Sequence, residues 1–110
     1  MNTDNLFGRR LRQARKAVGI SQRALGIKAG LDEFVASSRI NRYEQGVHRL
    51  SDILLIERIS AVLCVPISFF FARDDDEAEI MRRIHQLDPS LRYGVIKCIN
   101  NILESGEADE

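Results

Sequence analysis

The stretch Ser21–Gly46, SQRALGIKAGLDEFVASSRINRYEQG, determines how we interpret the rest of the chain. Its first part predicts a short helix, because Ser21 is a good N-cap whose hydroxyl can accept from a backbone N–H of the first turn. Leu25 and Ala29 follow four residues apart and therefore share one apolar face. Gly30 comes next and can adopt the left-handed conformation with which many helices end.

The second part of the stretch predicts another short helix with one apolar and one polar face. Ile40 and Tyr43 lie three residues apart, and Gly46 closes the helix. The residues around these apolar positions are hydrogen-bond donors, and no acidic residue interrupts them: Ser37, Ser38, Arg39, Asn41 and Arg42. Because base edges and phosphates offer mainly acceptors, such a face suits the major groove of double-stranded DNA.

With these motifs in this order, the stretch resembles the helix-turn-helix of the phage repressor and Cro family of transcriptional regulators, also called the XRE family. The family pattern has Ser-Gln, two residues, Leu, then Ala-Gly, and later Ile-x-x-Tyr-Glu-x-Gly. The chain supplies Ser21-Gln22, Leu25, Ala29-Gly30, Ile40, Tyr43-Glu44 and Gly46. The likeness extends over residues 6–72, with two departures: Gly26 replaces the usual Ala, and the turn Leu31–Ala36 is longer than usual.

The resemblance implies an all-α fold, a five-helix lambda-repressor-like DNA-binding domain, to which this chain adds two C-terminal helices. It also implies an ion pair between Arg15 and Glu44 that joins the first helix to the end of the recognition helix. Gln22 would face a DNA phosphate at the start of its helix. The residues that would read bases are Ser37, Ser38 and Arg42. Arg39 and Asn41 would make flanking contacts with bases or phosphates. Gln45 and Arg49 would contact the DNA backbone.

The longer turn leaves two starts open for the recognition helix. In one, Asp32 caps a long helix that runs through Phe34 and Val35. In the other, Ser37 caps a shorter helix, and the preceding loop tucks Phe34 or Val35 into the core. We prefer Ser37, because it keeps the later apolar positions in the register of the family.

The 110 residues are 45% apolar, which is enough for a real core in one domain or in a small domain with an appendage. The net charge is zero, but residues 1–50 carry ten Lys/Arg and four Asp/Glu, whereas residues 51–110 carry six and twelve. The cationic half contains the helix-turn-helix and suits a polyanionic partner. No apolar run approaches the roughly 20 residues of a membrane span, and no signal peptide opens the chain, so we expect a soluble cytoplasmic protein.

Apolar spacing predicts further helices on both sides of the stretch. Thr3 or Asp4 can cap a first helix that ends at Gly19 and buries one stripe, formed by Phe7, Leu11, Ala14 and Val18. A mostly buried helix begins near residues 51–52 and ends before Cys64. The family has a glycine at the position of Cys64, so the resemblance implies a left-handed conformation for this residue.

Residues 65–87 predict two helices. Val65-Pro66 starts a short one, in which Phe69, Phe70 and Phe71 cannot all face one small core, so one of them should be exposed. An acidic hinge then leads into a helix with a narrow apolar stripe, which is Ile80, Ile84 and Leu87.

Asp88-Pro89 predicts the cap and first position of a last helix that ends at Gly106. Its apolar surface is wide and includes Leu91, Val95, Ile96, Cys98, Ile99, Ile102 and Leu103. We prefer a homodimer contact here, and the interface candidates are Leu91, Val95, Ile99 and Ile102. The alternative is that the last two helices cover the N-terminal core. The chain would then comprise a DNA-binding domain (1–72), a dimerising helical extension (73–106) and a flexible tail (107–110).

No other chemistry is predicted by the remaining side chains. The two histidines and two cysteines lack the spacing of metal ligands, so we expect no metal, and we expect Cys64 and Cys98 to be buried reduced thiols. Without a phosphate loop, nucleophile elbow or H-E-x-x-H motif, we expect neither an enzyme nor a cofactor. Two functions remain: a repressor that binds a palindromic operator as a homodimer, or an antitoxin-like protein whose C-terminal helices bind a protein partner.

Overall fold

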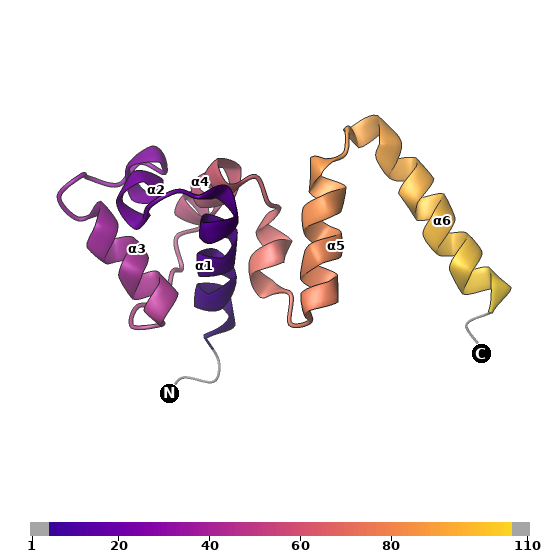
Figure 1. The fold of residues 1–110 in the computed structure, drawn as a ribbon, viewed down its shortest axis with the longest axis horizontal. Coiled ribbons are helices and arrows are strands. Elements are labelled where there is room, and N and C mark those ends of the chain that lie inside the picture. The colour runs from indigo at the N-terminus through magenta and orange to yellow at the C-terminus, as the bar shows by residue number, and fades with distance from the viewer. Residues whose placement is uncertain (1–4, 107–110) are drawn as a thin grey trace.

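The computed structural model describes residues 5–106, and all regular structure within this range is helical (Figure 1). The elements are α1 (Leu6–Val18), α2 (Gln22–Lys28), α3 (Ala36–Gln45), α4 (Ile53–Leu63), the 3₁₀ helix η1 (Ile67–Phe71), α5 (Asp75–Gln86), the 3₁₀ helix η2 (Pro89–Leu91) and α6 (Arg92–Ser105). The all-α prediction is confirmed. Thr3, Asp4 and the tail 107–110 lie outside the described residues.

Helices α1 to α4 and η1 enclose one apolar core, and α5 lies against η1 on the side away from α3 (Figure 1). The largest fully buried apolar side chains come from α1 to α4 and η1, and they are Leu11, Leu25, Ile40, Leu55, Ile59, Phe69 and Phe70. Helix α6 runs away from this body at an angle to α5, so that the molecule measures 54 × 34 × 23 Å. The helix-turn-helix and α6 therefore lie at opposite ends of the long axis.

Positive φ follows each of the helices α1 to α4, at positions that the sequence analysis identified: Gly19, Gly30, Gly46 and Cys64. Gly30, which follows the C-cap residue Ala29 of α2, has φ 98°, which glycine adopts without a steric penalty. Cys64 has φ 57° and ψ 43° at the end of α4, and it is the one non-glycine residue with positive φ among residues 5–106. The left-handed conformation that the resemblance implied for Cys64 is confirmed, at a cost of about 1–2 kcal/mol for an L side chain.

The packing of α5 and the burial of the cysteines differ from our predictions. Helix α5 packs through Ala78 and Met81, whereas Ile80 is exposed, because close approach to η1 favours the small side chain of Ala78. Cys64 and Cys98 are exposed free thiols rather than buried ones. The reason is that Cys64 occupies a helix end and Cys98 lies on α6, which buries none of its residues.

Asp88 caps the short 3₁₀ helix η2 and not the last α-helix as predicted, because α6 begins at Arg92; α6 does not cover the core. The Asp88 carboxylate accepts from the backbone N–H of Ser90 at 3.0 Å, and this bond lowers the pKa of Asp88. Gly106 ends α6 with φ 63°. Leu91 and Ile102 on the apolar side are exposed, so the alternative in which the last two helices cover the N-terminal core is wrong for α6, whereas α5 does pack against that core through Ala78 and Met81. Among residues 5–106, no helix combines the length and apolarity that crossing a membrane requires.

Residue Arg10 joins the N-terminal helices to α5 through a buried guanidinium. The side chain is 1% exposed, and it donates through Nε to the Ala72 carbonyl at 2.8 Å and through Nη2 to the Arg73 carbonyl at 3.3 Å. Its Nη1 donates to Asp75 Oδ1 at 3.0 Å, and its Cζ lies 5.9 Å from the centre of the Phe69 ring. One arginine from α1 thus fixes the segment that leads from η1 into α5.

Replacing this arginine should destabilise the protein more than removing its carboxylate partner. Arg10→Met keeps much of the side-chain volume but removes the donor from the buried bond to the Ala72 carbonyl and from the part-buried bond to the Arg73 carbonyl, so we expect a loss of about 2 kcal/mol or more. Asp75→Asn is the control, with an expected loss below about 1 kcal/mol, because this carboxylate is 89% exposed. Urea unfolding at neutral pH measures both, and equal losses would contradict the role of the carbonyls.

Candidate nucleic-acid interface

Helices α2 and α3 bury the apolar faces that their sequence predicts, and α2 begins with the predicted N-cap. The Ser21 Oγ accepts from the backbone N–H of Ala24 at 3.0 Å, which confirms Ser21 as the N-cap of α2. Leu25 is fully buried on α2, and Ile40 and Tyr43 are buried on α3. These contacts lock one face of each helix into the core and leave the opposite face of α3 in solvent.

A glycine lets α2 and α3 approach each other more closely than an alanine would. A Cβ atom placed on Gly26 would lie 2.7 Å from the Cβ of Ala36, at the first position of α3. Ala36 itself is fully buried. The departure from the family pattern at Gly26 therefore has a physical reason, because the start of α3 occupies the space that the usual Ala side chain would need.

The turn between the two helices differs from both of the alternatives that the sequence left open. Helix α3 begins at Ala36, and Val35 precedes it without a side-chain cap, so neither Asp32 nor Ser37 is the N-cap. Instead Asp32 Oδ1 accepts from the backbone N–H of Phe34 at 2.8 Å and closes a turn before the helix. The expectation that Phe34 or Val35 enters the core is also wrong: Phe34 is 87% exposed and Val35 is exposed as well.

The carboxylate of Glu44, at the end of α3, joins three helices. Its side chain is 1% exposed, and it accepts from Arg15 Nε at 2.6 Å and from Arg15 Nη2 at 3.2 Å. The Gln22 side-chain amide, from the start of α2, donates to the same carboxylate at 3.0 Å and to Asn41 Oδ1 at 3.1 Å. The structure thus contains the ion pair that the resemblance implied, together with two further hydrogen bonds that tie Gln22 to α3.

The exposed face of α3 presents most of the polar side chains that the sequence singled out. Five of them are exposed and lie on this helix: Ser37, Ser38, Asn41, Arg42 and Gln45. Arg39 is half-buried against Tyr43. Its Nε donates to the Tyr43 hydroxyl oxygen at 3.1 Å, and its Cζ lies 5.6 Å from the centre of the Tyr43 ring. Arg39 is therefore partly occupied within the protein, whereas Arg42 has no such bond among the described residues.

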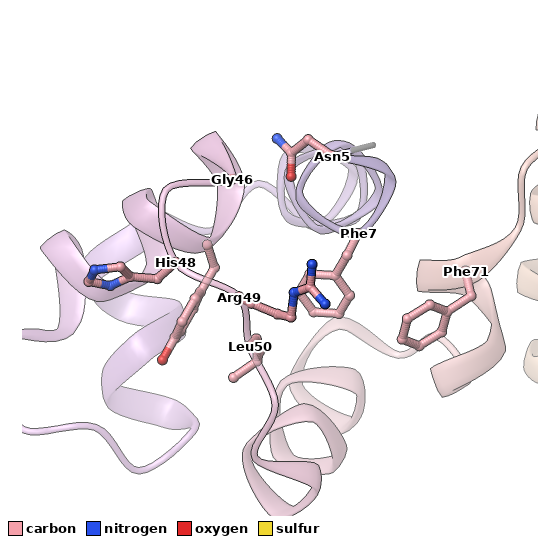
Figure 2. Close-up of a pocket in the computed structure, with 8 residues that line it drawn as sticks. Asn5, Phe7, Gly46, His48, Arg49, Leu50 and Phe71 are labelled. Carbon is pink, nitrogen blue, oxygen red and sulfur yellow. The ribbon is translucent and has the colours of Figure 1, made fainter. Parts of the chain in front are cut away.

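Arg49 lies apart from this face, beside a cavity of about 440 Å³ at the end of α3. The cavity is also lined by Phe7, Leu50 and Phe71. Figure 2 shows the Arg49 side chain directed toward the side of α1, whereas His48 points the opposite way. The structure therefore separates Arg49 from the cluster on α3, so that any contact with DNA through this arginine would be made beyond the C-terminal end of the helix.

Sequence reasoning missed two hydrogen bonds that support this surface. Asn41 was identified as a candidate contact, but not as the partner of Gln22. Asn5, just before α1, donates from its amide to the backbone carbonyl of Glu44 at 2.9 Å. Neither contact has a local sequence signal, because both join residues that are distant in the chain.

Comparisons with known proteins agree with this geometry. The helix-turn-helix domain family matches residues 6–67. Over 64 residues the chain is 39% identical to an uncharacterized HTH-type transcriptional regulator of Sinorhizobium medicae (strain WSM419), and likewise to one of Rhizobium meliloti (strain 1021), R00410. Each match covers 58% of this chain and 42% of the relative, so the chain spans less than half of the length of these curated relatives.

A solved structure matches over most of the chain. The crystal structure of the transcriptional regulator BswR superposes with a TM-score of 0.80 and 34% sequence identity, over 89% of this chain and 96% of that one. Since the family match covers more than half of the residues, the chain belongs to the helix-turn-helix domain family. The interpretation of Ser21–Gly46 as a helix-turn-helix is confirmed.

A double-mutant cycle tests the buried ion pair beneath this surface. Arg15→Met should cost about 3 kcal/mol of unfolding free energy, because it leaves the Glu44 carboxylate buried without its cation. The double variant Arg15→Met/Glu44→Met should recover part of this loss, since no uncompensated charge remains. Chemical denaturation measures the two single variants, Arg15→Met and Glu44→Met, and the double variant. Strictly additive losses would show that the two side chains do not act as a pair.

Proposed function

We propose that this protein is a transcriptional regulator of the phage repressor and Cro type, which binds double-stranded DNA sequence-specifically. The observation that carries the proposal is the exposed donor face of α3, held in place by the buried Glu44 carboxylate. The excess of ten Lys/Arg over four Asp/Glu in residues 1–50 supports a polyanionic partner. In the cytoplasm it would act as a repressor, by occupying an operator that polymerase needs.

The proposed contacts follow from where the side chains lie on α3. We assign base reading to Ser37, Ser38 and Arg42, because the N-terminal part and outer face of a recognition helix enter the major groove. Arg42 can donate two hydrogen bonds to guanine, whereas serines discriminate bases weakly. Asn41, Gln45 and Arg49 would contact flanking bases or the DNA backbone. Arg39 would do so while its guanidinium also donates to the Tyr43 hydroxyl.

Gln22 has a second part in this proposal. It lies at the first position of α2, where family members face a phosphate, but both N–H groups of its side-chain amide donate within the protein, to Glu44 and to Asn41. A phosphate contact through this amide would therefore replace the bond to Asn41. We propose that it contributes to affinity for every sequence alike, because a phosphate contact carries no base information.

The exposed apolar side of α6 supports a homodimer. Leu91, Ile99 and Ile102 are exposed large apolar side chains, and Val95 lies between them on the same side of the helix. A second copy of α6 would remove this surface from water and would bring two recognition helices to a palindromic operator. The same surface also supports the other candidate function, an antitoxin-like protein that binds a different protein through residues 73–106.

Selection from a random pool of DNA duplexes tests the proposed function. Wild-type protein should recover a palindrome whose half-sites lie about one helical turn apart, since a symmetric dimer reads two equivalent half-sites. A reporter with this palindrome across its promoter should be expressed less when the protein is present. The absence of enrichment, even at low ionic strength where phosphate contacts are strongest, would contradict DNA binding.

Substitutions on α3 and α2 should have different effects on sequence preference. Arg42→Ala should relax selection at one position of each half-site, with a loss of about 1–3 kcal/mol on the preferred base. Gln22→Ala should weaken binding to all duplexes by a similar factor. Fluorescence anisotropy with the selected duplex and its single-base variants measures both effects. A uniform loss from both substitutions would remove the base-reading assignment of Arg42.

Two substitutions that add one negative charge to α6 test the dimer. Ile99→Asp should raise the dimer dissociation constant by roughly a hundredfold or more, because each copy loses about 1.5 kcal/mol or more of apolar burial. Asn101→Asp is the matched control and should leave the dimer intact. Sedimentation equilibrium measures both. A monomeric wild-type protein would contradict the homodimer and would favour the antitoxin-like alternative.

A further inference from the structure

Phe34 is the most exposed of the large apolar side chains among residues 5–106. It is 87% exposed, in the turn that projects between α2 and α3 at the end of the molecule remote from α6 (Figure 1). This turn is the segment that lengthens the chain relative to the family pattern. A single exposed apolar residue needs no explanation by itself, but this one immediately precedes the helix that the proposed function inserts into DNA.

The turn brings Phe34 to within two residues of the start of α3. Val35 is the N-cap of this helix, and its carbonyl accepts from the Arg39 N–H at 2.8 Å. The buried side of α3 carries Ala36 and Ile40, whereas Phe34, Ser37 and Ser38 are exposed. Phe34 is therefore an exposed apolar group directly before the polar, exposed residues of α3.

Hydrogen bonds hold this turn, and its acidic groups are occupied. The Asp32 carboxylate accepts from the backbone N–H of Phe34 at 2.8 Å, and its carbonyl accepts from Val35 N–H at 3.0 Å. The Glu33 carboxylate lies 3.6 Å from Arg23 Nη2 of α2. The charge of Glu33 is thus partly offset by Arg23, and Phe34 is the most exposed large apolar side chain of the turn.

We propose that Phe34 recognises the 5-methyl group of a thymine in the major groove, an inference that rests on the proposed function. Thymine is the one base whose major-groove edge presents a methyl group, and a phenylalanine ring is among the side chains that contact it favourably. Arg42, which is exposed on α3, can donate hydrogen bonds to acceptors on neighbouring base edges and phosphates. Phe34 would add an apolar contact to the hydrogen bonds that α3 can make.

This inference is tested by removing the thymine methyl group from the DNA and the Phe34 ring from the protein, first separately and then together. The probe is the duplex that wild-type protein recovers from a random pool, with each thymine of one half-site replaced in turn by deoxyuridine. Wild-type protein should lose about fourfold in affinity at one position, the factor that corresponds to one buried methyl group. Phe34→Ala should bind the thymine duplex more weakly and should not distinguish it from the deoxyuridine duplex.

Two control variants separate the ring contact from general effects. Phe34→Leu keeps an apolar side chain and should retain part of the preference for thymine. Ile80→Ala removes an exposed apolar side chain from α5, away from α3, and should behave as wild type. Thermal unfolding followed by circular dichroism should show that all variants fold.

Three results would overturn the proposal. They are a recovered site without thymine, wild-type binding that is indifferent to deoxyuridine at every position, and equal losses on deoxyuridine for wild type and Phe34→Ala. Any of these would leave DNA binding itself in place. Wild-type protein that enriches no duplex at all would instead overturn the proposed function, and this inference with it.

Discussion

The buried carboxylate of Glu44 is the interaction on which the recognition surface depends. It belongs to α3, and it accepts hydrogen bonds from Arg15 of α1 and from Gln22 of α2. A carboxylate with 1% exposure is stable only when its oxygens are paired. The same pairing therefore fixes three helices relative to one another, and the outer face of α3 is presented on a rigid frame. Recognition of bases needs such a frame, because small displacements break hydrogen bonds to base edges.

Local chemistry made much of the fold predictable from the sequence. Ser21 caps α2, and Gly30 has a positive φ, because these features depend on a residue and its immediate neighbours. The left-handed backbone of Cys64 was implied by the family resemblance instead. The start of α3 could not be predicted in the same way. It depends on the contact between Gly26 and Ala36, which belong to different helices. The longer turn has its own hydrogen bonds through Asp32, so neither cap that the sequence suggested is used.

Amphipathic patterns identified apolar faces but not what covers them. The stripe on α5 was placed on Ile80, whereas the contact is made by Ala78, and the wide face of α6 lies in solvent. For the candidate site, the resemblance supplied the residues, but it could not show which donors are already engaged within the protein. Arg39 bonds to Tyr43, for example, and this depends on the side-chain conformations of the folded chain. The two ends of the molecule thus carry separate surfaces, one polar and one apolar.

The central claim is that α3, held by Glu44, is the element that meets DNA. Amide chemical-shift changes in the ¹⁵N-labelled protein, on titration with a duplex recovered by selection, test this claim most directly. The account predicts that the largest changes fall in residues 34–45 and at the start of α2, and that the interior of α6 changes little. Changes concentrated in α5 and α6, with α3 unaffected, would contradict it.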